Sequence, residues 1–146
     1  MLTEDLKTLL ATNFSFYLKS QMFHWNVEGP DFVELHRFFS KIYGNAYDAV
    51  DRIAEYIRVL DDYTPGSLTR FQELSQISDQ VKVPRAQLMI SELTVDNQIM
   101  IALLNQCFNS AVSEQQEGIA NFLAERIDTH SRWNWMLRSI SKEERA

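Results

Sequence analysis

The chain contains 146 residues, of which 45% are hydrophobic and 12% aromatic, proportions typical of a globular protein. This length predicts one domain, spanning residues 1–146, and excludes two domains with separate cores. A formal net charge of -6 disfavours a surface that holds DNA phosphates. With one cysteine, no basic leader and no apolar run of membrane-spanning length, we expect a soluble, cytoplasmic protein with no membrane contact.

The first predicted helix spans residues 3–28. Its apolar residues recur on one stripe, and that stripe ends at His24. Gly29 supplies a C-terminal stop, and Pro30 prevents the helix from continuing.

The second predicted helix spans residues 31–60 and would be about 45 Å long. Asp31 followed by Glu34 predicts a capping box at its start. Gly44 is the one helix-weakening residue before Pro65.

Two further long helices are predicted in the second half of the chain. The third begins near Pro84 and has apolar residues at heptad-like spacing. Ser113 and Gln116 predict another capping box, opening a fourth helix that extends to about residue 140. We expect His130 on this helix to be a packing residue.

More than twenty residues link the second and third helices, which is unusual inside a compact domain. Within this link Leu68, Phe71, Leu74 and Ile77 recur every third residue and predict a short amphipathic helix. The link can reach about 45 to 50 Å, so helices two and three can run parallel. The predicted fold is therefore all-α, a ferritin-like four-helix bundle with a long crossover that contains a short helix.

The second helix carries three candidate metal ligands on one broad face: His36, Asp51 and Glu55. His36 and Asp51 lie about 22 Å apart along the helix, so they cannot bind one ion within a single chain. A two-fold axis near Gly44 and Asn45 would place His36 beside the carboxylates of an antiparallel copy.

His24, at the end of the neighbouring helix, would add a second imidazole. Small side chains at Gly44, Ala46 and Ala49 would let the two helices approach closely. Two imidazoles from one subunit and two carboxylates from another suit iron or zinc.

The same residues also have ordinary structural explanations. The histidines can be hydrogen-bonded packing residues, and Asp51 and Glu55 can pair with Arg52 or Arg58 on a solvated surface. The Glu-x-x-His motif of di-iron bundles does not occur in the sequence, which argues against an iron site inside one subunit.

Three motifs resemble the Dps family of miniferritins: "HWNVEGPDFVELH", then "DRIAE", and "WML" near the C-terminus. The resemblance covers nearly the whole chain. It implies a hollow dodecamer that oxidises Fe(II) with hydrogen peroxide or O2, stores the Fe(III) mineral inside, and protects against oxidative damage.

Carried over by position, the resemblance makes His24 and His36 ligands from one subunit. Asp51 and Glu55 would come from its two-fold mate. Trp25 would lie beside the iron and intercept reactive intermediates, although an indole there can equally be an interface anchor.

The sequence departs from the family pattern at Ser40, where an aspartate is usual. A hydroxyl is a poor iron ligand, so we expect one tight iron per site and a weakened second position. The alternative function is a ferroxidase-impaired shell with a structural or DNA-associated role.

Tight DNA binding is not expected. Family members that bind DNA often use a lysine-rich tail, whereas this chain ends in "SKEERA". Twelve copies would carry a formal charge of about -72, which repels phosphates.

Overall fold

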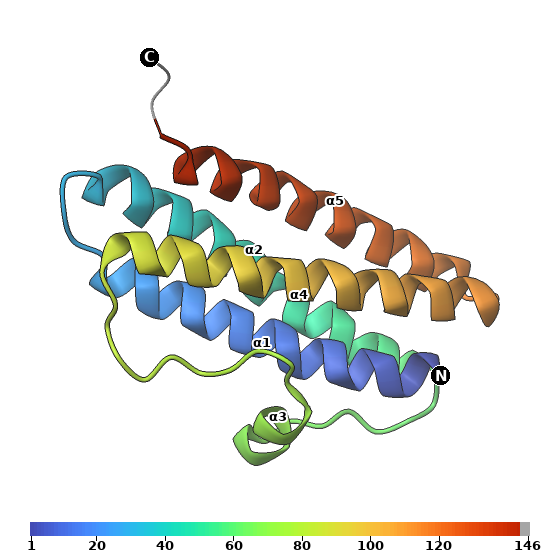
Figure 1. Ribbon diagram of the computed structural model, residues 1–146. Helices are drawn as coiled ribbons and strands as arrows, with labels where there is room; N and C mark the ends of the chain where they lie inside the picture. Colours follow the sequence, from blue (N-terminus) through green and yellow to red (C-terminus); the bar gives the residue numbers. More distant parts are fainter. Residues whose placement is uncertain (144–146) are drawn as a thin grey trace.

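The computed structural model describes residues 1–143 and contains five helices within that range. Four are long and form a bundle, and one is short, as the sequence predicts (Figure 1). Their bounds are α1 Leu2–Asn26, α2 Phe32–Val59, α3 Leu68–Leu74, α4 Ala86–Ser113 and α5 Glu117–Ser141.

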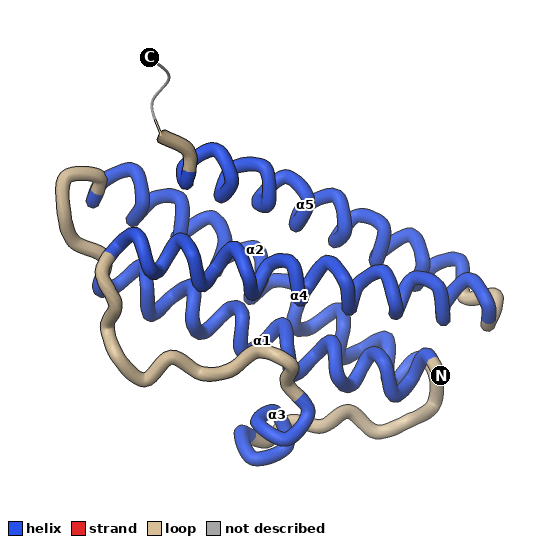
Figure 2. The backbone as a smooth tube through the Cα atoms, in the orientation of Figure 1, coloured by secondary structure: helices blue, strands red, loops and turns tan. Residues whose placement is uncertain are grey.

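The connection between α2 and α4 runs back along the whole bundle, so these two helices are parallel (Figures 1 and 2). Hydrogen bonds attach this crossover to the bundle: the Gln76 amide donates to Thr12 Oγ1 at 3.1 Å, and Gln80 Nε2 donates to Glu92 Oε1 at 2.8 Å. The predicted long-crossover topology is confirmed.

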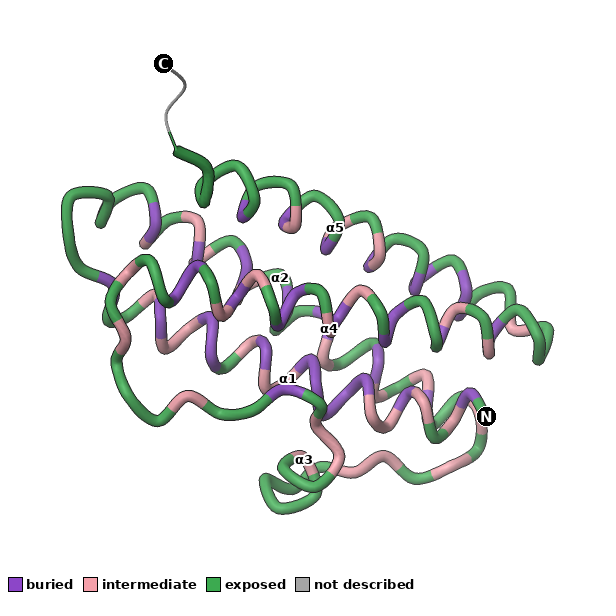
Figure 3. Tube along the Cα trace, in the orientation of Figure 1, coloured by how far each residue is buried: buried purple, intermediate pink, exposed green. Residues whose placement is uncertain are grey.

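Each long helix turns one buried stripe toward the bundle axis (Figure 3). The stripe on α2 consists of Leu35, Phe39, Ile42, Ala46, Ala49, Ile53 and Ile57. Ala46 and Ala49 therefore pack inside their own subunit, and the prediction that they face a partner is wrong. Gly44 remains available, because a Cβ added there would meet no atom within 4 Å.

Both predicted capping boxes are wrong. Asp31 is the N-cap of α2, but its φ of -101° and ψ of 23° are not the extended values of a capping residue, and its side chain caps nothing. Ser113 still belongs to α4, and Gln115, with φ of 60°, reverses the chain before α5.

Among the residues predicted for the short helix, Ile77 lies beyond its end but is buried.

His130 is a packing residue, as expected. Its fully buried ring donates from Nδ1 to Asn97 Oδ1 at 2.7 Å, and Asn97 Nδ2 donates to the His130 carbonyl at 2.8 Å. Arg126 Nη2 lies 3.3 Å from Nε2. Burial, together with the Arg126 charge, lowers the pKa of His130 well below its usual value.

This buried imidazole predicts a pH-dependent stability. Unfolded His130 takes up a proton below about pH 6.5, whereas the folded protein keeps the ring neutral, so the free energy of unfolding should fall as the pH falls from there toward the folded pKa. The slope from one such group is at most about 1.4 kcal/mol per pH unit. Urea midpoints between pH 7.5 and 5 measure it. The His130→Gln variant should have a shallower slope, and equal slopes would contradict the assignment.

Candidate metal centre

The turn between α1 and α2 brings the two predicted histidines together. Gly29 has a φ of 117°, a value that side-chain-bearing residues rarely adopt, and it reverses the chain between the two helices. His24 in the last turn of α1 then stacks on His36 in α2, with ring centroids 3.8 Å apart and planes inclined by 18°.

Two reciprocal hydrogen bonds fix the orientation of these rings. His24 Nδ1 lies 2.8 Å from the carbonyl oxygen of His36, and His36 Nδ1 lies 2.8 Å from that of His24. A carbonyl oxygen only accepts, so the tautomer that these bonds select carries its proton on Nδ1. In that tautomer Nε2 has a free lone pair, and metal-binding histidines are commonly held by such a bond.

The two predicted carboxylates lie together one helical turn apart on α2. Both residues are exposed, and the hydrogen bond and charge of Asp51 raise the pKa of Glu55. The predicted alternative, pairing with arginine, does not occur within residues 1–143. Arg52 Nη2 donates to Tyr56 Oη at 2.8 Å instead, and Arg58 Nη1 donates to the Asp62 carbonyl at 2.8 Å.

The fold therefore forms two pairs of candidate ligands. Fifteen residues of continuous helix separate His36 from Asp51, about 22 Å along α2. In the described part of the chain no group of three or more His, Cys, Asp or Glu side chains can hold a metal ion.

Two other predicted residues lie close to the histidines in sequence. Ser40 is half-buried on α2, one turn after His36. Trp25 is 61% exposed and lines a hollow of about 280 Å³ with Leu18 and Met22 of α1 and Val81 of the crossover. The indole thus lies at the surface between α1 and the crossover.

Sequence reasoning missed the aromatic surroundings of the histidines. The Tyr43 ring lies 5.0 Å from that of His24, and the Phe32 ring stacks on His36 at 5.1 Å. Tyr43 follows His36 by seven residues, two helical turns, so the 3.6-residue period would have placed it on the same face.

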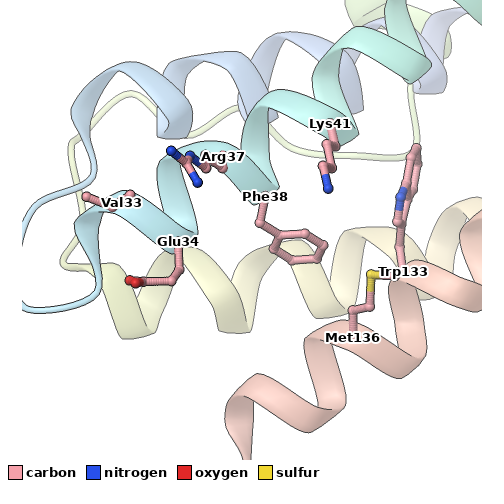
Figure 4. Close-up of a pocket in the computed structure, with 7 residues that line it drawn as sticks. All are labelled: Val33, Glu34, Arg37, Phe38, Lys41, Trp133 and Met136. Atoms are coloured by element: carbon pink, nitrogen blue, oxygen red, sulfur yellow. The ribbon is translucent and has the colours of Figure 1, made fainter.

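A second hollow, of about 270 Å³, lies between α2 and α5 (Figure 4). The Phe38 and Trp133 rings and the Met136 thioether face it, with Arg37 and Lys41 along one side. None of the five predicted site residues lines it, and neither does Ser40.

Comparisons with known proteins agree with this fold. The ferritin-like domain model matches residues 3–146. An uncharacterized low temperature-induced protein of Nostoc sp. is 33% identical over 133 residues, 90% of this chain and 74% of that protein. The DNA protection during starvation protein 2 of Bacillus anthracis is 26% identical over 94% of both chains.

Solved structures give the same result. The crystal structure of Dps from Staphylococcus aureus matches with a TM-score of 0.93 and 27% identity, covering 98% of this chain and 96% of that one. No helix of the described chain is both long and apolar enough to cross a membrane. The chain belongs to the ferritin-like family and, within it, to the Dps family.

Proposed function

We propose that the protein oxidises Fe(II) with hydrogen peroxide or O2 at sites between paired copies and stores the ferric iron inside a hollow dodecamer. The observation that carries this proposal is the locked pair of stacked imidazoles, in which backbone carbonyls occupy both Nδ1 atoms and leave both Nε2 atoms for a ligand. Two nitrogens and two carboxylates form a ligand set that binds iron and leaves coordination positions open for an oxidant.

An antiparallel arrangement of two α2 helices completes each site. A two-fold axis near Gly44 puts the imidazoles of one copy beside Asp51 and Glu55 of the other, and the same operation forms a second site. The open space next to Gly44 supports this contact. Arg126 of α5 donates a hydrogen bond to the Asn45 side chain, so Asn45 is directed toward α5 and not toward the proposed partner. The partner would instead contact Tyr43 and Tyr47 on the outer face of α2.

Iron is the substrate of this reaction. Two Fe(II) ions give one electron each to hydrogen peroxide, whose O–O bond breaks while two protons are taken up, and two waters form. Removing Fe(II) and peroxide together prevents the production of hydroxyl radicals.

The main test is complementation between two inactive variants. His36→Ala and Asp51→Asn should each lower the initial rate of Fe(II) oxidation by at least about tenfold, since losing a ligand costs no less than losing a residue that supports one. In an equal mixture of unfolded and reassembled chains, half of the pairs are mixed and each mixed pair regains one intact site. Activity should return to about one quarter of the wild-type value.

A matched mixture controls for this result. His24→Ala and His36→Ala remove ligands from the same side of the site, so mixed pairs regain no intact site and activity should stay low. A site within one chain predicts no recovery in either mixture, and that result would refute the shared site.

Ser40 predicts how many ions each site binds. The wild-type shell should bind one tight Zn(II), a redox-silent substitute for Fe(II), per site in calorimetric titration. Ser40→Asp should add a second tight ion because it adds a carboxylate, whereas the neutral, similarly sized Ser40→Asn should not. Two equally tight ions in the wild-type protein would overturn this prediction.

The alternative is a ferroxidase-impaired shell with a structural or DNA-associated role, and Ser40 is the residue that favours it. The charge of the assembled shell argues against the DNA-associated form. In a gel-shift assay at moderate salt without divalent cations, we expect no retardation of DNA by nanomolar protein. Retardation in that range would favour the alternative.

A further inference from the structure

The hollow between α2 and α5 has an apolar wall and a basic wall (Figure 4). Phe38, Trp133 and Met136 form the apolar wall, and Trp133 is only 7% exposed. Lys41 extends from α2 toward the two rings, and Arg37 lies one helical turn before it. The volume of about 270 Å³ is close to the lower limit for small-molecule sites in proteins, so it suits a molecule with one or two rings.

The basic side chains of this hollow have no acidic partner. Among the ion pairs within residues 1–143, none includes Arg37 or Lys41. Of the described residues that line the hollow, only Glu34 is acidic, and its carboxylate points away from the Phe38 and Trp133 rings (Figure 4). The hollow therefore has a positively charged side in a chain whose formal net charge is -6.

A buried arginine adds to this positive charge. Arg126 lies two turns before Trp133 on α5, and its guanidinium carbon is 5.9 Å from the centre of the Trp133 ring. Arg126 is 7% exposed, and within the described chain its hydrogen-bonding neighbours are the uncharged side chains of Asn45 and His130. Burial lowers the pKa of Arg126 to about 10, so the guanidinium keeps its charge at neutral pH.

A buried cation without a counter-ion is costly, and an anion bound close to it lowers that cost. Trp133 is the side chain that Arg126 and the hollow share. Both the exposed cations on the rim and the buried one behind them therefore favour a negatively charged ligand in the hollow.

The two walls together define the chemistry of that ligand. An inorganic anion would use the basic wall and leave the apolar wall without a partner. An uncharged ring would do the reverse. An aromatic ring that carries a carboxylate satisfies both, because the ring can pack on Phe38 and Trp133 and contact the Met136 thioether. Its carboxylate would accept charge-assisted hydrogen bonds from Lys41 and Arg37.

We propose that the hollow between α2 and α5 is a binding site for a small aromatic carboxylate. This site is separate from the candidate metal centre. Arg37 follows His36 directly, but neighbouring residues of a helix point about 100° apart, and neither histidine lines the hollow. Binding therefore requires no iron and does not rest on the proposed function.

The test uses the assembled shell and 4-bromobenzoate. Calorimetric titration should show one saturable site per subunit, and a soaked crystal should give a bromine anomalous peak between Phe38 and Trp133. 4-Bromobenzamide has nearly the same shape without the charge, so it should bind about tenfold more weakly. Lys41→Gln should weaken binding of the benzoate severalfold and leave that of the benzamide unchanged. Lys82→Gln, at an exposed lysine of the crossover, should behave as the wild type.

A second variant tests the position of the site. Met136 is exposed at the mouth of the hollow, so Met136→Glu should leave the fold intact and abolish binding of the benzoate by placing a negative charge there.

Four outcomes would overturn the proposal: no saturable binding to the shell, a bromine peak outside the hollow or in the crystal only, equal affinity for benzoate and benzamide, or unchanged binding by Met136→Glu. No step of the test involves iron, so a failure of the proposed function would leave its result unaffected.

Discussion

The stacked histidines, each hydrogen-bonded to the other's backbone, are the constraint on which the site depends. Neither ring can turn freely, because both Nδ1 atoms are held by carbonyl oxygens only 2.8 Å away, which leaves each Nε2 as the nitrogen available to a ligand. The tight turn at Gly29 makes this geometry possible by bringing the end of α1 against the start of α2. A pair fixed in this way would lose little side-chain entropy on binding the proposed iron.

The length of α2 determines the rest of the proposed arrangement. A straight helix cannot bring His36 to carboxylates about 22 Å away, so a second copy must supply what one chain lacks. The crossover contributes indirectly, because it makes α2 and α4 parallel and leaves the outer face of α2 uncovered around Tyr47. Oxidation chemistry would then depend on assembly, since a separated chain holds each half of the ligand set apart from the other.

Periodicity and chain breakers predicted four long helices, the short helix and the parallel crossover, because these features depend on apolar spacing and on Gly29, Pro30 and the long link. The same period placed His36 and Asp51 on one broad face. The helical period did not predict features that depend on local dihedral angles or on which neighbouring element covers a helix. Asp31 does not cap, and Ala46 faces its own core. The hydrogen bonds that orient the imidazoles join two helices through the backbone, and residue spacing does not encode them.

The central claim is that iron binds between two copies of the chain, and anomalous scattering from an Fe(II)-soaked crystal tests it most directly. The account predicts an iron peak bound by Nε2 of His24 and His36 from one subunit and by Asp51 and Glu55 from its two-fold mate. A peak bound by ligands of one subunit alone, or imidazoles directed away from any neighbouring carboxylate, would contradict it.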